Sequence, residues 1–549
     1  MKKLKKATED VFEVHPEMKN IIQPGNGMLE NFRNDKRKIE IPIIKLSDAE
    51  WEETRKGLIQ PFMYTEGEPV FHAAIYKTGS GNYFFFDLGH IMGDGMSMNI
   101  IFEDINALYL GKKLEKQSYT MYEYILDEQE RIRLGKRQKY IENFKKMMEN
   151  LKIKKSIMNR KDYHDLDKGI TGVLNGDLEG LSKKAVQAFC NRYNVSENVF
   201  FLSAFTYCVS LFANEDDVVC TSTHSGRTDS RWYRVIGPLY MTYYFRFTRK
   251  PHETVPELLQ KSAAQILQTM DNQLTNVKAD EIFFQYQGDI LGIDTIGGAP
   301  AEIQDMQLDA MPFHMQVMTN KKGYYYQLRY WENRFDRETL EVFLRCYRAV
   351  LEAMMTESSV RRLRKYVADS DKPKHFYVEA GKLNEAAGFE LFSGISADTK
   401  VKAYVLDDTY LKKPFGAWGN LYIQNYPTKD YVDKIDNPSG NEEGVLYHTG
   451  HVARITPAGT VEFLENTGRT VMLETLMGRV YIDLHKVENV LCQCEGVTSA
   501  KAYTYYGGDN VILVGADVTG IEEKDIERVL ACAAEHLEKV SVPSKLVCL

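Results

Sequence analysis

The sequence predicts a mixed α/β (α+β) protein built from several globular units. Its 549 residues exceed one ordinary core, and a domain size of about 150 residues suggests three or four units. Hydrophobic residues make up 44% of the chain and charged residues 27%, a balance typical of globular proteins. Apolar runs of strand length and stretches of helical periodicity both occur, which indicates both kinds of element.

Charge and hydropathy restrict the partners and the location. The net charge is -8 with both signs interspersed, so no basic stripe is present to follow a nucleic-acid backbone. The start, MKKLKK, is basic, but no apolar run follows, which argues against a secretory signal. The longest apolar stretch, 199–213, is too short to span a bilayer and contains polar residues. We expect a buried helix there, and a cytoplasmic protein without nucleic-acid or membrane partners.

The eight cysteines are scattered along the chain. Cys492 and Cys494 are the one close pair, and no second pair completes a metal site. Cys208 and Cys346 lie inside apolar segments. We therefore expect no metal, and buried free thiols in a reducing compartment.

Helices and strands are predicted in the first half of the chain from periodicity. Residues 4–22 begin as an amphipathic helix. The apolar runs 71–76 and 83–88 flank the turn-forming segment TGSGN, which predicts a hairpin. Apolar residues from Met98 to Tyr109 then recur at helical spacing. The charged residues 130–162 are typical of a solvated helix face.

The second half of the chain also contains both predicted strands and predicted helices. Gly169, Gly172 and Gly176 would interrupt any helix and mark a boundary between two lobes. Residues 217–221 predict a strand and 335–355 a helix. Residues 356–395 lose periodicity and gain charge, as an interdomain linker would. Short strands at 401–406 and 420–423 and a mixed α/β segment from about 468 complete the chain.

His90 and Asp94 are the candidate site residues, because they lie in the loop between the predicted hairpin and the helix that follows it. A histidine held at the end of a strand is suited to act as a general base near neutral pH. Asp94 is suited to hold the loop through backbone hydrogen bonds or an arginine, and Gly95 permits backbone shapes closed to other residues. Taken alone, the pattern equally fits a loop histidine and a turn-forming Asp-Gly pair.

The surrounding segment, DLGHIMGDGMS at 87–97, resembles the HHxxxDGxS signature of condensation domains in nonribosomal peptide synthetases, members of the chloramphenicol-acetyltransferase-like (CAT-like) superfamily. Further resemblances follow in colinear order and cover roughly residues 4–358. They are VHPEMK at 14–19, PF at 61–62 with EPVF at 68–71, YTMYEY at 119–124, DDVV at 216–219 leading to SGR at 225–227, and IGPLYMT at 236–242 ending at Arg246.

The resemblance implies a two-lobed CAT-like fold around a tunnel, in which amide bonds form between substrates tethered to phosphopantetheine on separate carrier proteins. It implies that His90 positions or deprotonates the acceptor amine, that Asp94 is structural and paired with Arg246 or Arg227, and that Gly95 lies near the developing oxyanion. No tightly bound cofactor is implied. The sequence departs from the family at Gly89, where the first histidine of the motif would stand, and at Met241, in place of an asparagine.

Residues 396–549 resemble the last part of an adenylation domain. The similar segments are YVLD at 404–407, GAWGNLYI at 416–423, LYHTGH at 446–451, GRTVMLETLMG at 468–478 and IDLHKVE at 482–488. The polar positions of that family correspond here to His451, Val471, Leu473 and Thr475, and the phosphate loop has no counterpart. We expect a remnant without adenylation activity, because an ATP site needs groups that hold phosphate and metal.

Together these inferences divide the chain and leave alternatives open. The expected parts are an N-lobe at 1–168, a C-lobe at 169–358, a linker at 359–395, a β-rich adenylation-like remnant at 396–467 and an α/β adenylation-like part at 468–549. The expected function is amide-bond formation by a condensation domain. An O-acyltransferase of the same superfamily and a catalytically silent scaffold that docks carriers remain the alternatives; an open tunnel reaching His90 would favour an enzyme.

Overall fold

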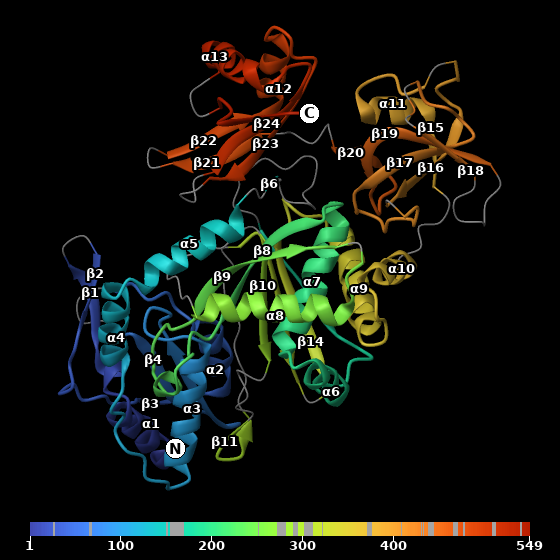
Figure 1. The fold of residues 1–549 in the computed structure, drawn as a ribbon. Helices are drawn as coiled ribbons and strands as arrows, with labels where there is room; N and C mark the ends of the chain where they lie inside the picture. Colours follow the sequence, from blue (N-terminus) through green and yellow to red (C-terminus); the bar gives the residue numbers. More distant parts are fainter. Residues whose placement is uncertain are drawn as a thin grey trace.

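The structure is a computed structural model in which the elements form successive units along the chain (Figure 1). It describes all residues except 26–27, 65–68, 150–151, 154–169, 251, 272–281, 289–294, 301–310, 321, 371–375, 393, 408, 430, 432, 437–443, 465–469, 476–477, 508–511 and 538–540. The expected lobe boundary at 168/169 and the motif residues Glu68, Gly468 and Arg469 therefore lie outside the described residues. So do the side chains of Val471, Leu473 and Thr475.

The amino-terminal unit, drawn in blue and cyan in Figure 1, contains a three-stranded sheet in the order β3-β4-β5. Helices α1 and α3 pack on it around a core that includes Val11, Phe12, Phe86 and Ile101. The predicted hairpin and the helix after it are confirmed, whereas the first helix ends at Val14, just before Pro16. The elements are α1 (Lys2–Val14), η1 (Pro16–Lys19), β1 (Ile21–Gly25), β2 (Met28–Phe32), β3 (Ile43–Lys45), α2 (Asp48–Thr54), η2 (Arg55–Gly57), β4 (Phe71–Lys77), β5 (Asn82–Leu88), α3 (Gly95–Tyr109), α4 (Met121–Arg133) and α5 (Lys136–Met148).

The next unit is built on a six-stranded sheet in the order β7-β14-β13-β10-β8-β9, which we call the central sheet. Helix α7 forms its core, with every residue from Val199 to Ala213 buried, as predicted from the apolar run. Gly172 and Gly176 lie inside strand β7, where the rings of Tyr330 and Tyr326 on β14 occupy the space of a side chain. The elements are β7 (Thr171–Asp177), α6 (Lys183–Tyr193), α7 (Glu197–Ala213), β8 (Asp217–His224), η3 (Ser230–Trp232), β9 (Met241–Thr248), α8 (Val255–Asp271), β10 (Ile282–Gly288), β11 (Thr295–Ile296), β12 (Ala299–Pro300), β13 (Phe313–Thr319), β14 (Tyr324–Trp331) and α9 (Arg337–Met354).

The range 359–395, expected to be a linker without periodicity, instead contains α10 (Val360–Ser370), β15 (Phe376–Glu379) and α11 (Ala380–Ala387). Helix α10 packs against α9 and buries Val360, Leu363 and Val367 in the core of the central sheet. These three residues have helical spacing, but the arginines between them hide the pattern in a short segment. The expectation of irregular structure in this range was therefore wrong.

A second six-stranded sheet follows, in the order β15-β16-β17-β19-β18 with β20 pairing to β19 (orange in Figure 1). It contacts the unit before it: the Trp418 backbone N–H donates to Phe212 at 2.9 Å, and Lys413 Nζ donates to the Leu211 carbonyl at 2.7 Å. The C-terminal end of α7 is thus capped by the segment that connects β16 (Lys400–Leu406) to β17 (Gly419–Gln424). Its further strands are β16 (Lys400–Leu406), β17 (Gly419–Gln424), β18 (Asp433–Asp436), β19 (Val445–Ile455) and β20 (Val461–Phe463).

The last unit, red in Figure 1, has a sheet in the order β25-β24-β23-β6, so a strand from far earlier in the chain forms its edge. Helices α12 and α13 cover this sheet. The elements are β6 (Lys152–Ile153), β21 (Thr470–Thr475), β22 (Gly478–Asp483), α12 (Leu484–Gln493), β23 (Ser499–Tyr506), β24 (Ile512–Thr519), η5 (Glu523–Asp525), α13 (Ile526–His536) and β25 (Lys545–Cys548).

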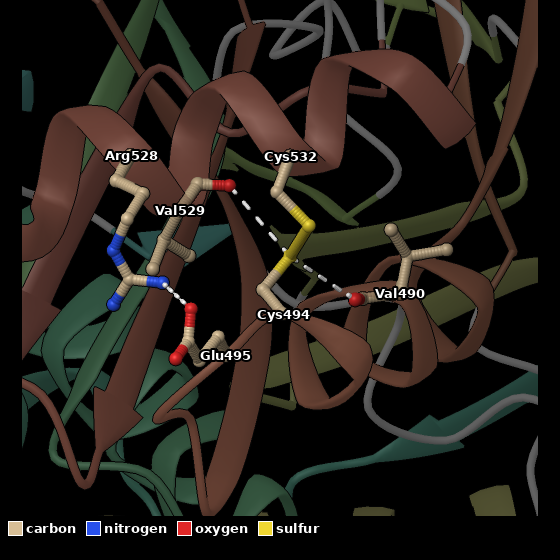
Figure 2. The surroundings of a disulfide bond; sticks show 6 residues. All are labelled: Val490, Cys494, Glu495, Arg528, Val529 and Cys532. Carbon is tan, nitrogen blue, oxygen red and sulfur yellow. Dashed lines mark hydrogen bonds and ion pairs between the residues drawn. A yellow bond between two sulfur atoms is a disulfide. The ribbon is translucent and has the colours of Figure 1, made fainter.

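A disulfide joins Cys494, just after α12, to Cys532 on α13 (Figure 2). Their Cα atoms lie 6.1 Å apart, within the range that a disulfide bridges. The expectation that all eight cysteines are free was therefore wrong for these two. The pairing depends on how α12 packs on α13, 38 residues later, and no local spacing reveals it.

Candidate active site

His90 lies two residues beyond strand β5 and five residues before α3 begins. Its side chain is exposed and lines a cavity of ≈ 1810 Å³ between the amino-terminal unit and the central sheet. The ring of Tyr240 meets the imidazole edge-on, with 5.4 Å between ring centroids. The strand end therefore holds His90 at a cavity large enough for a substrate.

Asp94 is the N-cap of helix α3 and is only 6% exposed. Its Oδ1 accepts from the backbone N–H and the hydroxyl of Ser97, both at 2.9 Å. Its Oδ2 accepts from the backbone N–H groups of Leu239 and Tyr240, both at 3.1 Å. Arg227 completes the arrangement, with Nη1 2.8 Å from Oδ2 and Nη2 3.0 Å from Oδ1. Both oxygens of the buried Asp94 carboxylate are thus occupied by hydrogen bonds from the protein, which hold the loop and the start of α3 in place.

Of the two arginines predicted as partners of Asp94, the structure brings Arg227 to it and places Arg246 elsewhere. Arg246 lies on β9 opposite Val219 of β8, and its guanidinium pairs with Asp217 at 2.9 and 2.6 Å. It lies five positions after Met241, where β9 begins next to the site. Because a strand advances about 3.3 Å per residue, Arg246 lies well away from Asp94.

Gly95 is the first residue of α3 and lines the cavity. As the first helical residue, its backbone N–H belongs to the group without partners inside the helix, at the positive end of the helix dipole. Its backbone is helical, so the unusual backbone shape expected of Gly95 is not needed. Gly226 needs one instead: its φ is +68°, and a Cβ there would lie 1.7 Å from the Leu239 carbonyl oxygen.

The two departures from the family pattern lie in packed surroundings. Gly89 is buried, and a Cβ there would lie 3.2 Å from both the Tyr64 hydroxyl and the Val70 carbonyl oxygen. Met241 is 5% exposed and pairs with His224 across strands β9 and β8. Neither position adds a titratable group to the cavity.

His224 is a cavity residue that sequence reasoning missed. Burial lowers the pKa of His224 to about 4, so the imidazole is neutral near pH 7. Its Nδ1 accepts from the Gly226 backbone N–H at 3.0 Å, which leaves the proton on Nε2. The residue lies directly before the SGR segment, but the sequence does not reveal that the end of β8 opens into the cavity.

In the parts of the chain that the structure describes, no three His, Cys, Asp or Glu side chains gather in a way that could hold a metal ion. Within the same ranges no single helix has the length and apolarity to cross a bilayer; α6 and α7 pass that test only together, as a pair bent by 93°.

The sequence is similar to a family of known proteins. A family model described as Condensation domain matches residues 1–279, more than half of the chain. Surfactin synthase subunit 1 of Bacillus subtilis (strain 168) is 20% identical over 379 residues, which cover 64% of this chain and 10% of that protein. Tyrocidine synthase 3 of Brevibacillus parabrevis is 20% identical over 400 residues, 67% of this chain and 6% of that protein. The chain thus spans a tenth or less of these relatives.

Solved structures show the same fold at low identity. A four-domain nonribosomal peptide synthetase bound to AMP and glycine aligns with a TM-score of 0.63 and 13% identity, covering 100% of this chain and 67% of that one. The condensation domain from Monacolin K polyketide synthase aligns with a TM-score of 0.55 and 15% identity, covering 65% of this chain and 90% of that one. The predicted CAT-like condensation fold is confirmed.

Proposed function

We propose, from the premise that this chain belongs to the condensation-domain family, that it forms an amide bond between a carrier-tethered acyl or aminoacyl thioester and an amine in nonribosomal peptide synthesis. The observation that carries this proposal is the cavity that reaches His90. A silent scaffold does not need an open cavity at this histidine, so the open cavity favours an enzyme.

The proposed reaction is an acyl transfer. The amine nitrogen attacks the thioester carbonyl, a C–N bond forms, and the C–S bond breaks to release the phosphopantetheine thiol. His90 holds the amine or accepts its proton, which ends on the leaving thiolate. The N–H of Gly95, at the start of α3, is suited to stabilise the oxyanion. Asp94 and Arg227 hold the loop that carries both residues and are positioning residues.

The partners in this proposal are separate carrier proteins bearing phosphopantetheine, and the location is cytoplasmic. Relatives that this chain resembles are synthases of which it spans a tenth or less, and one aligned structure is a four-domain synthetase. Carriers supplied in trans, the cytoplasmic location and the absence of a tightly bound cofactor stay predictions.

The proposal treats residues 396–549 as a degenerate remnant of an adenylation domain. Support comes from the ring environment of His451, which stands at the position expected for a ribose-binding carboxylate. Its imidazole centroid lies 4.9 Å from that of Phe389 and 6.0 Å from that of Phe463. The His451 imidazole packs among aromatic rings and lacks the two oxygens with which a carboxylate would hold the ribose hydroxyls.

The test is incubation of the chain with a loaded donor carrier and a loaded acceptor carrier, followed by intact-mass detection of the condensed product. We expect product with the wild-type chain and a loss of about 10²–10⁴-fold in rate for His90→Ala, the usual general-base effect. His252→Ala, at an exposed histidine before α8, serves as the matched control and keeps wild-type turnover. Wild-type turnover in His90→Ala would remove His90 from the mechanism.

The same assay separates the alternatives. Replacing the acceptor amine by the matching alcohol tests for an O-acyltransferase, which would acylate the alcohol and leave the amine unchanged. Carrier binding without product on either acceptor would identify a scaffold and contradict the proposed function.

A further inference from the structure

Three of the described residues that line the cavity are histidines: His90, His224 and His314. The Nε2 atom of His314 lies 3.3 Å from the side-chain oxygen of Gln285 and 3.1 Å from the side-chain nitrogen of Gln316. His224, the last residue of strand β8, instead has a ring nitrogen that no described residue bonds. The cavity therefore contains a second imidazole, besides His90, that is able to bind a substrate.

The imidazole of His224 is held in one orientation by its surroundings. Its Nδ1 accepts from the Gly226 backbone N–H at 3.0 Å. The ring of Tyr243 lies beside it, with 5.8 Å between the two centroids. Because Nδ1 accepts a hydrogen bond, the proton of the neutral ring is on Nε2. Nε2–H is thus the group that His224 offers to a ligand in the cavity.

His224 is suited to an uncharged acceptor. Burial lowers the pKa of His224 to about 4, so the ring carries no charge near pH 7. Its one acceptor nitrogen is occupied by the Gly226 N–H, which leaves the ring as a hydrogen-bond donor. A carbonyl oxygen of a substrate matches a neutral donor of this kind.

The contacts of strand β9 place His224 near His90. His224 is the register partner of Met241, the first residue of β9. The residue before Met241 is Tyr240, whose ring lies 5.4 Å from that of His90 between centroids. The Tyr240 backbone N–H also donates to Asp94, at 3.1 Å. One strand pair and one ring contact therefore connect the two histidines, which border the same part of the cavity from different units of the fold.

We propose that His224 is a catalytic residue of the condensation site and that its Nε2–H donates to the carbonyl oxygen of the tethered thioester. The inference rests on the proposed function and adds a hydrogen-bond donor to it. The carbonyl oxygen gains negative charge as the amine nitrogen bonds to the carbonyl carbon, and it loses this charge when the C–S bond breaks. His224 keeps its proton throughout. Its hydrogen bond is stronger in the transition state than in the ground state and so lowers the barrier.

Two substitutions separate this role from a structural one. His224→Asn keeps an oxygen that is placed to accept from the Gly226 N–H, but it removes the Nε2 donor. His224→Gln extends a side-chain N–H toward the position of Nε2, but it removes the acceptor for Gly226. The first variant therefore preserves the structural contact, and the second preserves the donor.

The carrier assay measures kcat and KM for both variants. We expect His224→Asn to lower kcat by about 10²–10³-fold with little change in KM, the usual effect of removing one donor to an oxyanion. His224→Gln should keep kcat within about tenfold of wild type. His252→Asn makes the same change at an exposed histidine and should behave as wild type.

A structural role of His224 predicts the reverse order, because only His224→Asn keeps the contact with Gly226. Wild-type kcat in His224→Asn overturns the inference, and so does an equal loss of kcat in both variants.

Isotope-edited infrared spectroscopy of the full chain tests the hydrogen bond without turnover. The probe is a donor carrier loaded with alanine through a thioester whose carbonyl carbon is ¹³C, and no acceptor is added. A hydrogen bond to the carbonyl oxygen weakens the C=O bond. We therefore expect a lower C=O stretching frequency with wild type and His224→Gln than with His224→Asn. A frequency with wild type that equals that of the free carrier in water overturns the inference, whether or not the variants fold.

The two measurements distinguish the inference from the proposed function. A lowered frequency that depends on His224, without condensed product in the carrier assay, supports the hydrogen bond and contradicts amide-bond formation. Condensed product formed at wild-type kcat by His224→Asn supports amide-bond formation and overturns the role of His224.

Discussion

Arg227, beyond the end of strand β8, grips both carboxylate oxygens of Asp94, which lies 133 residues earlier at the start of helix α3. Their side chains are 1% and 5% exposed. The guanidinium also donates to the carbonyl oxygens of Ser225 and Val235, so it is held on several sides. Asp94 lies four residues after His90 in the loop that leads into α3, so the pair ties this loop to the unit of the central sheet.

Asp94→Ala should destabilise the fold by about 3–5 kcal/mol, the usual cost of leaving one member of a buried pair without its partner. The substitution also removes the acceptor of the Ser97, Leu239 and Tyr240 backbone N–H groups. Denaturant titration of wild type and variant measures the change in the free energy of unfolding.

The matched control for Asp94→Ala is Asp217→Ala, which breaks the pair with Arg246. The Arg246 side chain is 18% exposed and that of Asp217 36%, so we expect the free energy of unfolding to fall by about 0–1 kcal/mol. Equal losses of unfolding free energy for the two variants would show that the buried Asp94–Arg227 pair contributes no more to stability than the more exposed Asp217–Arg246 pair.

Gly226→Ala should lower both stability and activity. The residue has φ +68°, and the new Cβ would meet the Leu239 carbonyl oxygen, whose residue also donates its N–H to Asp94. Gly111→Ala is the control, because Gly111 has φ +91° with no atom within 4 Å of a Cβ. The control should show only the cost of a left-handed residue, about 1–2 kcal/mol. Thermal unfolding that is no lower for Gly226→Ala than for Gly111→Ala would contradict the steric argument.

The pH dependence of stability should reflect His224. Burial lowers the pKa of His224 to about 4, below the ordinary value of about 6.5 that it regains on unfolding. The unfolded chain therefore binds more protons between these values, and this contribution to stability is lost as pH falls from about 6.5 toward 4. The slope is at most about 1.4 kcal/mol per pH unit.

The measurement compares wild type with His224→Asn, whose side-chain oxygen is placed to accept from the Gly226 N–H. The stability of wild type must be compared with that of the variant at each pH, because His15 changes the pH dependence of stability in the opposite direction. Burial of His15 lowers its pKa, but the hydrogen bond to Asp104 and the negative charge of the nearby Glu17 carboxylate outweigh this and raise it overall. Its contribution is present at low pH and is lost as pH rises. A stability difference between wild type and His224→Asn that stays constant from pH 4 to 7 would refute the buried neutral imidazole.

The segment 396–549 should neither bind ATP nor activate amino acids. His451 lies among aromatic rings where a ribose-binding carboxylate would be needed. Pyrophosphate exchange by the full chain should stay at the level of a blank without amino acid, for each amino acid tested. Exchange above that blank, or a calorimetric signal for ATP, would show a working adenylation site.

Much of the local structure could be read from consecutive residues. The apolar run at 199–213 predicts α7, the paired runs around TGSGN predict β4 and β5, and Asp94 stands where a helix N-cap belongs. The position of His90 in the loop follows from the same pattern. Such features depend on hydrophobic periodicity and on capping, which act between neighbours in the chain.

The sequence by itself thus determined many of the elements, the family resemblance and the candidate histidine, while the tertiary structure decided which distant groups meet. Asp94 forms its ion pair with Arg227. The register of β8 and β9 places Arg246 where it pairs with Asp217 instead. Packing of α12 on α13 pairs Cys494 with Cys532, and the pairing of β8 with β9 sets His224 opposite Met241 at the cavity. These contacts join residues far apart in the chain, so their geometry depends on the packing of whole elements and not on any local pattern.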